Sequence, residues 1–407
     1  MDTNTIITGT SDTNTVTIDT SKGNVDVTFD DLNIDASSRN EAAMSVTGSG
    51  NTTIKLDGDN HLTGGISDNG SYGLSGISSS GSLTISGGET DSLTAQGGSG
   101  TDGSGGRGIF SKDLTISGGT VNANGGDGKN GSGGSGISSL GSLTISGGTV
   151  NAAGGDGTNS SDGGDGITNN CGVTISSGGT VTAKGGSGED GSGGRGIIST
   201  KSVTISGGTV KSNGGSGTIS GGNGILSYDI DLSGSLELTA KAGSPNGKAL
   251  SRVGSELDLD DIKDKLGPGA KVTATDADGK VIDQVSIPRP VEPEESSSSS
   301  DGGSATPSAP VSSLPGLTVT AKDGQRISYT STQSGNTLTV CVGRLTASLH
   351  VSLAALRQLR AEGIETIAFQ TVLCSTTLSV DELLAMGGED AEAVLTHRLT
   401  DSSLTVG

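Results

Sequence analysis

The chain has 407 residues, of which 73 are glycine, none is tryptophan, and three each are phenylalanine and tyrosine. Large aromatic side chains supply much of the buried area of an ordinary globular core, so this composition excludes a core of that kind. The formal net charge is −21, which argues against nucleic acid and anionic membrane surfaces as direct partners.

Membrane insertion is not expected, because no run of about 20 apolar residues is present. The segment Met1–Thr10 is polar and does not resemble a signal peptide. The Gly/Ser/Thr-rich composition is nevertheless that of an extracellular protein. We therefore expect an extracellular or cell-surface location, with a natural leader trimmed from this sequence.

Two segments with alternating apolar and polar residues open the chain, VDVTFDDLNIDA over residues 25–36 and NTTIKLDGDNHL over residues 51–62. A period of two predicts strands whose apolar side chains share one face. These segments also carry an acidic group, made of Asp30, Asp31, Asp57 and Asp59. The simpler interpretation of this group is a set of solvated acids at strand ends.

A repeat of about 30 residues follows. Its first phrase is Leu/Val-Thr-Ile-Ser, its second is Thr-Val-x-Ala, and its third is Gly-x-Gly-Ile. The first phrase begins at Leu83, Leu114, Leu143, Val173 and Val203. Because the phrases are short, apolar and separated by Gly, Ser, Asp and Asn, each copy predicts three strands joined by turns.

One such unit cannot bury its apolar residues alone, whereas stacked units bury a continuous column of them. The sequence therefore predicts an all-β fold, a right-handed parallel β-helix of about eight or nine coils over residues 1–287, with a triangular cross-section. Residues 257–266 are expected to form a short capping helix, since acidic residues occupy its first turn. Residues 272–285 then predict the last strands.

The loops between the second and third strands are rich in Gly, Asp and Asn. Stacking is expected to align their polar residues in two exposed columns, Ser99, Asp127, Asp156 and Ser187 in one and Asp102, Asn130, Asn159 and Asp190 in the other. Calcium takes carboxylate, amide and carbonyl oxygens, so calcium between the coils is one interpretation. The other interpretation is a set of Gly-rich turns with Asx hydrogen bonds and an Asn ladder.

The variable position of the Gly-x-Gly-Ile phrase gives the candidate ligand-binding residues Arg107, Asp165 and Arg195. Stacking predicts that Asp165 and Arg195 are neighbours on adjacent coils. A surface ion pair is the simpler interpretation of these two residues, and such a pair stabilises a fold only slightly.

Residues 288–316 contain most of the prolines and a run of serines, so they predict an extended linker. Residues 317–407 predict a small α/β or α+β module, with strands over 317–321, 336–342 and 364–371. One helix is expected over 353–362, after Ser352, and a second after Ser379, where a capping box begins. Cys341 and Cys374 lie in this module and could pair.

The alternating N-terminal segments, followed by NTTIKLDGDNHLTGG and the repeated LTISGGTVNANGG, resemble the carbohydrate-binding β-helix family of clostridia and related gut Firmicutes, typified by a secreted cellulose- and pectin-binding protein. The resemblance covers roughly residues 15–285. It implies a right-handed parallel β-helix, bound calcium, binding of plant cell-wall polysaccharide and no demonstrated hydrolysis. The family's calcium ligands lie near strand ends, which implies Asp30, Asp31, Asp57, Asp59 and the Gly/Asp loops here.

Three classes of function are open at this stage. The favoured one is a non-catalytic carbohydrate-binding or adhesion protein, taking an acidic, pectin-like polysaccharide through calcium because aromatic faces for stacking on cellulose are scarce. The second is a purely structural surface stalk. The third is a polysaccharide lyase or hydrolase, which requires converging carboxylates or a basic catalytic residue. No such constellation is evident, so we expect no enzyme.

Overall fold

The computed structural model describes residues 5–288 except 69 and 177, and residues 316–406 except 322–324, 328, 335, 343, 345, 372–374, 387–391 and 398–401. The chain divides into two compact units, residues 1–293 and 294–407. The predicted linker over 288–316 lies almost entirely outside the described residues.

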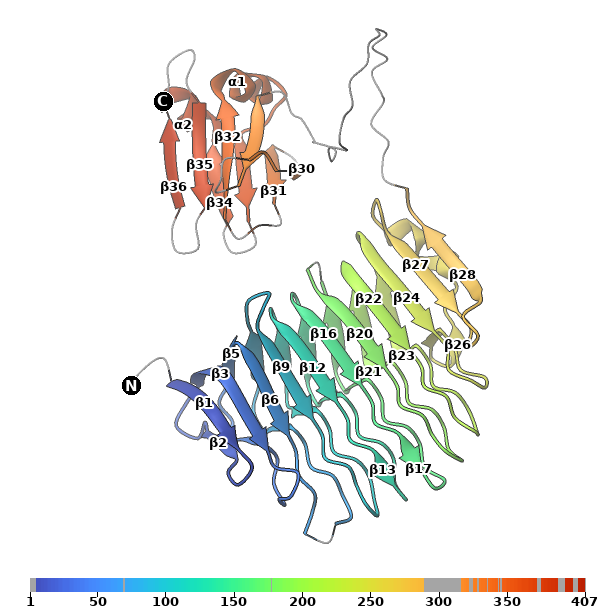
Figure 1. Cartoon of the computed structure of the whole chain (residues 1–407). Coiled ribbons are helices and arrows are strands. Elements are labelled where there is room, and N and C mark those ends of the chain that lie inside the picture. Colours follow the sequence, from blue (N-terminus) through green and yellow to red (C-terminus); the bar gives the residue numbers. More distant parts are fainter. Residues whose placement is uncertain are drawn as a thin grey trace, which may run out of the picture. The chain divides into compact units, whose positions relative to one another are not determined.

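The first unit is a β-solenoid of about 11 turns whose parallel strands stack on three faces (Figure 1). Face one contains β5 (Thr52–Asp57), β8 (Leu83–Ser86), β11 (Leu114–Ile116), β15 (Ser142–Ile145) and β19 (Gly172–Ile175). Face two contains β6 (Asp59–Thr63), β9 (Ser92–Gln96), β12 (Thr120–Asn124), β16 (Thr149–Ala153), β20 (Thr180–Lys184), β22 (Gly208–Asn213), β24 (Leu236–Lys241) and β27 (Lys271–Thr275).

Face three contains β2 (Val16–Asp19), β4 (Met44–Thr47), β7 (Ile77–Ser79), β10 (Ile109–Ser111), β14 (Ile137–Ser139), β18 (Ile167–Asn169) and β25 (Leu250–Arg252). Four longer strands turn a corner between faces, namely β1 (Thr5–Ser11), β3 (Val25–Asp35), β21 (Ile197–Ile205) and β23 (Ile225–Leu232). The parallel stack thus begins at β1 and extends to β27, beyond the clear repeats, which explains why there are more turns than the eight or nine expected.

Equivalent residues of successive coils pair in register and fill the interior. Leu114 pairs with Leu143, and Ile116 pairs with Ile145, as the phrase spacing predicted. The side chains of these two isoleucines are completely buried. Because alternate residues point to opposite faces of a strand, the threonine between them faces outward. The predicted inner columns of face one are confirmed.

The Gly-rich segments are not simple turns. We call residues 97–108, 125–136, 154–166, 185–196 and 214–224 the glycine fin; in each coil they form an outgoing and a returning arm, seen in Figure 1 as the long parallel loops beside β9 to β24. The two arms are joined by hydrogen bonds between glycine backbones. The N–H of Gly106 donates to the carbonyl of Gly98 in its own coil (2.8 Å), and that of Gly126 in the next coil donates to the carbonyl of Gly106 (2.8 Å).

This zigzag of bonds continues without interruption to Gly243. The N–H groups of flanking residues such as Gly97 and Gly100 donate instead to carbonyls of the next coil, those of Asn124 and Asp127. Side chains cannot fit between the arms. A Cβ atom at Gly126 would lie 2.0 Å from the carbonyl oxygen of Gly98, well inside contact distance. The fin is therefore a two-layered structure with a backbone interior.

The C-terminal end of the solenoid is closed by local structure. The predicted capping helix is a 3₁₀ helix, η1 (Leu259–Lys265), whose N-cap Asp258 accepts a hydrogen bond from the N–H of Asp260. It buries Leu259 and Ile262 against the core. The antiparallel strand β28 (Val281–Ser286) then pairs with β27, and the short β26 (Ser255–Glu256) turns back on β25.

The second unit combines helices and strands, as in the predicted α/β or α+β module, and has two four-stranded sheets among its described residues. One sheet is antiparallel and contains β29 (Leu317–Thr320), β32 (Ala347–Ser352), β35 (Glu392–His397) and β36 (Ser402–Val406). The other contains β30 (Thr330–Ser334), β31 (Thr337–Cys341), β33 (Thr366–Gln370) and β34 (Ser375–Ser379). Both expected helices are present, α1 (Leu353–Ala361), capped by Ser352, and α2 (Val380–Met386).

The two cysteines of this module are not both described. Cys341 has a free thiol, which donates to Oε1 of Gln370 (3.3 Å) and whose pKa is raised by burial. Cys374 lies outside the described residues, and so does any pairing of the two cysteines.

Candidate ligand-binding groove

The acidic column Ser99, Asp127, Asp156 and Ser187 lies on the outgoing arms of the fin, with its members stacked as predicted. Oδ1 of Asp127 accepts the backbone N–H of Asp156 (2.8 Å), and Oδ1 of Asp156 accepts that of Ser187 (2.6 Å). Each carboxylate therefore hydrogen-bonds to the backbone of the following coil. The column therefore links successive coils through side-chain to backbone hydrogen bonds.

The second column, near the fin tips, is an amide ladder. Nδ2 of Asn130 donates to Oδ1 of Asp102 (2.7 Å), and Nδ2 of Asn159 donates to Oδ1 of Asn130 (2.7 Å). Asn130, Asn159 and Asp190 have φ values of 59°, 56° and 55°. Asn and Asp tolerate this left-handed conformation better than most residues, which explains their presence here.

The N-terminal acids lie at the turn between faces one and two, where they accept hydrogen bonds from neighbouring coils. Oδ1 of Asp31 accepts the backbone N–H of Asp59 (2.9 Å), and Oδ1 of Asp59 accepts the hydroxyl of Ser92 (2.7 Å). Asp30 and Asp57 are directly paired on β3 and β5.

These arrangements do not by themselves form a metal centre. Within the described ranges, no group of three or more His, Cys, Asp or Glu side chains is placed to hold a metal ion. Four of the carboxylates each have one oxygen that already accepts a hydrogen bond from another coil, namely those of Asp31, Asp59, Asp127 and Asp156. The carboxylates alone thus do not fit a calcium site, and calcium stays a prediction that would need carbonyl and amide oxygens as well.

The variable row of the Gly-x-Gly-Ile phrase lies on the returning arms, at the base of the fin. Asp165 and Arg195 are neighbours, with Nη1 of Arg195 3.6 Å from Oδ1 of Asp165, which confirms the predicted ion pair. Oδ2 of Asp165 also accepts the hydroxyl of Thr168 (3.0 Å). Arg107 lies elsewhere in the same row, on the first coil of the fin, where it lines a groove.

This groove, of about 480 Å³, lies where the short N-terminal coils meet the taller fin. Its floor is made by outward-facing residues of face three, Thr17 on β2, Ser45 on β4 and Ser78 on β7, which are stacked in register. The returning arm of the fin, with Arg107, contributes one wall, and Asn40 and Glu41 contribute another part of the lining. The groove thus crosses successive coils and runs along the axis of the stack.

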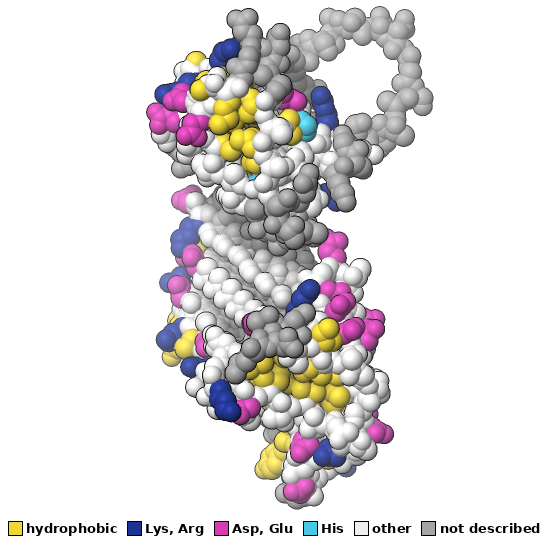
Figure 2. Space-filling model, turned by 90° about the vertical axis from the view of Figure 1, so that its left-hand side faces the viewer, with side chains coloured by type: hydrophobic (Ala, Val, Ile, Leu, Met, Phe, Trp, Pro, Cys, Tyr) yellow, Lys and Arg dark blue, Asp and Glu magenta, His cyan; other side chains and the backbone are white. Residues whose placement is uncertain are grey.

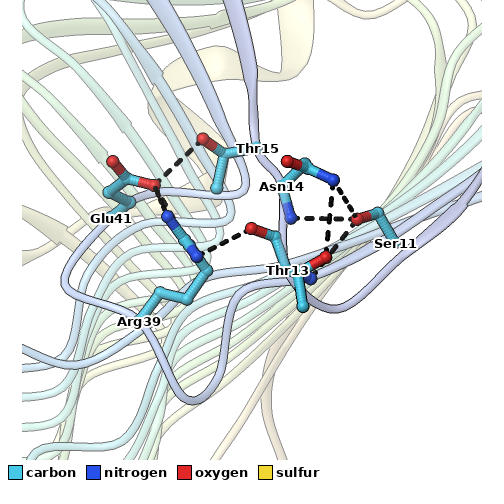
Figure 3. Close-up of polar contacts among 6 residues, drawn as sticks. All are labelled: Ser11, Thr13, Asn14, Thr15, Arg39 and Glu41. Carbon is cyan, nitrogen blue, oxygen red and sulfur yellow. Dashed lines mark hydrogen bonds and ion pairs between the residues drawn. The ribbon is translucent and has the colours of Figure 1, made fainter.

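An ion-paired network holds the Glu41 side of the groove (Figure 3). Oε2 of Glu41 accepts from Nη2 and Nε of Arg39 (3.0 and 3.2 Å) and from the hydroxyl of Thr15 (3.1 Å). These hydrogen bonds, first from Arg39 and then from Thr15, lower the pKa of Glu41. Nη1 of Arg39 also donates to the carbonyl of Thr13 (2.7 Å), which ties the loop of one coil to the turn of the coil before it.

The backbone of this loop is fixed by the following coil. The N–H groups of Gly65 and Ile66 donate to the carbonyls of Glu41 (3.0 Å) and Arg39 (2.8 Å). A Cβ atom at Gly65 would lie 1.9 Å from the carbonyl oxygen of Arg39, so glycine is required for this approach. The groove is therefore preorganised by contacts from the coils on both sides.

Sequence reasoning identified Arg107 but missed Thr15, Arg39, Asn40 and Glu41. These residues lie in N-terminal coils whose loops do not repeat, so periodicity gave no signal for them. The signal that could have found them is a length difference. The connections before β2 and β4, residues 12–15 and 36–43, are shorter than residues 64–76 before β7 and the Gly-rich segments that follow, and a step between short and long coils creates a concave surface.

Comparisons with protein-family models, curated proteins and solved structures found no match to this chain. Among the described residues, no helix is long and apolar enough to cross a membrane.

Proposed function

We propose that the first unit is a non-catalytic carbohydrate-binding module of an extracellular or cell-surface protein, and that it holds a polysaccharide chain in the N-terminal groove. The observation that carries this proposal is the floor of the groove, where Thr17, Ser45 and Ser78 present one hydroxyl group per coil. Successive coils are spaced by about 4.8 Å, which is close to the length of one sugar in an extended chain.

The chemistry of the lining suits sugar hydroxyls. Serine and threonine both donate and accept, the Asn40 amide does so with separate atoms, and the Glu41 carboxylate accepts only. On the face of the first unit seen in Figure 2, uncharged polar side chains and backbone form the upper part between the charged margins, and hydrophobic side chains gather below it. A repeating surface of this kind favours a repeating polymer, because several weak contacts act together.

The lining supports binding more than hydrolysis. Glycoside hydrolysis uses two carboxyl groups on opposite sides of the scissile bond. Among the described residues that line the groove, Glu41 is the only carboxylic acid, and its lowered pKa makes it a poor proton donor near neutral pH. We therefore retain the proposal of a binding protein.

The test is a binding measurement on the full chain against immobilised plant polysaccharides, followed by isothermal titration with soluble oligosaccharides. Ser45→Leu fills the floor of the groove, and we expect it to weaken binding about tenfold or more. Thr144→Leu, at an outward position of β15 on face one, is the matched control and should bind normally.

Binding lost in both variants, or in neither, would remove the groove from the proposal. If the folded wild-type chain binds none of the polysaccharides, the carbohydrate-binding proposal is overturned in favour of the structural stalk. The continuous hydrogen bonding of the glycine fin is the observation that favours this second candidate, since it makes a stiff rod.

A further inference from the structure

We infer that the groove selects an acidic glycan, a chain of uronic acid residues, and that Arg107 determines this specificity by binding a sugar carboxylate. The inference rests on the proposed function, because it assigns the chemical class of the ligand at the same site. It is carried by the position, support and charge balance of Arg107.

Arg107 is exposed on the fin wall of the groove, and its guanidinium group is supported from below by an aromatic ring. Its Cζ atom lies 5.1 Å from the centroid of the Phe110 ring, on β10. Stacking on a ring holds the planar guanidinium in one orientation and leaves the N–H groups of its edge to donate. A planar fork of donors matches the two oxygens of a carboxylate.

The repeat provides an internal comparison for this residue. Arg195 occupies the same position of the phrase on a later coil, but Asp165 neutralises it at 3.6 Å. The residue that corresponds to Phe110 on this later coil is Ile198, which is aliphatic and also faces outward on face three. Arg107 has no ion-pair partner in the described part of the chain, so only the arginine in the groove has both an aromatic support and an uncompensated charge.

The other charges near the groove cancel. Glu41 is paired with Arg39 at 3.0 Å, so this pair contributes little net charge to the lining. Arg107 therefore gives the groove a local positive charge although the whole chain carries −21. Because the hydroxyl floor runs from β2 to β7 and Phe110 follows Ser78 in register on β10, a chain lying along the floor brings a sugar to Arg107.

The experiment compares oligogalacturonides with their methyl esters, which have the same backbone without the charge. Titrations are done on the full chain at low ionic strength and in EDTA, so that calcium cannot bridge carboxylates to the protein. We expect the wild type to bind the acid about 10- to 100-fold more tightly than the ester, as for a charge-assisted hydrogen bond. Arg107→Gln should remove this preference while still binding the ester.

Two further variants separate charge from geometry. Arg107→Lys keeps the charge but loses the stacked fork, and we expect it to retain only part of the preference. Arg195→Gln removes an arginine of the same row and should behave as the wild type. Equal binding of acid and ester, an unchanged preference in Arg107→Gln, or acid binding only when calcium is present would overturn the role of Arg107. If the chain binds neither ligand class and no other glycan, the proposed function itself is contradicted.

Discussion

Within a single coil of the solenoid, residues 143–153 bury side chains, whereas residues 154–166 bury backbone. Leu143, Ile145 and Val150 have no exposed surface and pack against their equivalents in neighbouring coils. In the fin of the same coil, Gly155 donates to the carbonyl of Gly134 (2.9 Å) and accepts from the N–H of Gly164 (2.8 Å). Both regions are closely packed, the first through apolar side chains and the second through hydrogen-bonded backbone.

The difference teaches that a solenoid can be wide without large side chains. Apolar burial stabilises the triangular core at about 25 cal/mol per Å² of buried surface. The fin buries almost no apolar surface, so it depends on satisfying each buried peptide group, where an unpaired donor or acceptor costs about 1–3 kcal/mol. The core should therefore be most sensitive to the removal of a buried side chain, and the fin should be most sensitive to an added atom.

The largest effect is expected in the core. Ile145→Ala removes a fully buried side chain between Ile116 and Ile175, and we expect a loss of about 2–5 kcal/mol in the free energy of unfolding. Denaturant unfolding of the full chain, followed by far-ultraviolet circular dichroism, measures it. Ile145→Val is the milder control, at about 0.5–1.5 kcal/mol. Equal effects of both variants would mean that the interior is not closely packed.

A smaller and more local effect is expected in the fin. Gly155→Ala would place a Cβ atom 2.0 Å from the carbonyl oxygen of Gly126, so the arms must separate and break hydrogen bonds. We expect a loss of about 1–3 kcal/mol, with hydrogen-exchange protection lost in neighbouring fin segments and retained in β15. Gly172→Ala is the control, because its Cβ atom would lie 3.2 Å from the hydroxyl and 3.8 Å from the carbonyl oxygen of Ser202. Protection lost equally in core and fin would show that they open as one unit.

The amide ladder at the fin tips gives a third, weaker test. Asn159→Ala removes the hydrogen bond to Asn130, and for an exposed position we expect a loss of no more than about 1 kcal/mol. If the ladder alone explains these residues, the thermal midpoint after EDTA treatment should not rise on addition of millimolar calcium. A clear rise in the wild type that is reduced in this variant would establish calcium as a ligand of the fin.

The C-terminal module has a third kind of interior, with a buried histidine. His397 has no exposed surface, its ring nitrogens face the hydroxyls of Thr371 (3.3 Å) and Thr376 (2.9 Å), and burial lowers its pKa from the usual 6.5. The unfolded chain then takes up the proton first as the pH falls. The stability that this group contributes is full above pH 6.5 and is lost as the pH falls through 6.5 toward the lower folded-state pKa, at no more than about 1.4 kcal/mol per pH unit.

This smallest effect is measured by hydrogen exchange of β35 at pH 7.5 and 5.5. Exchange in β35 should accelerate at the lower pH after correction for the intrinsic rate, and it should accelerate less in His397→Gln. The core strand β15 of the solenoid is the internal control. Acceleration of the same size in β15 would mean that the effect does not come from His397.

Periodicity was enough to predict the core of the solenoid. The phrase beginning at Leu83 and its copies predicted the strands, their register and their inward side chains, because the alternation and the repeat length together leave few other ways to bury these residues. Local capping signals likewise predicted η1, α1 and α2. Several strands of the C-terminal module, among them β32 and β35, were not predicted, since their pairing depends on partners distant in the chain.

For the candidate site, the sequence identified Arg107 and the neighbouring pair Asp165 and Arg195, because a repeat places equivalent positions on adjacent coils. It did not identify Arg39, Glu41 and Thr15, which come together from two coils that do not share a phrase. It also treated the glycines as turn formers, since composition shows that a segment is permissive but not which carbonyl it approaches.

The sequence by itself thus determined the stacking of coils, the identity of the core columns and the alignment of polar residues in rows. The physical reason is that burial of alternating apolar residues acts between positions related by a fixed spacing. Only the tertiary structure decided that the two glycine arms of each coil pack against each other, and that the step between short and long coils forms a groove beside Arg107. Both features depend on which backbone atoms approach across the stack, and steric fit between backbones leaves no periodic signature in the sequence.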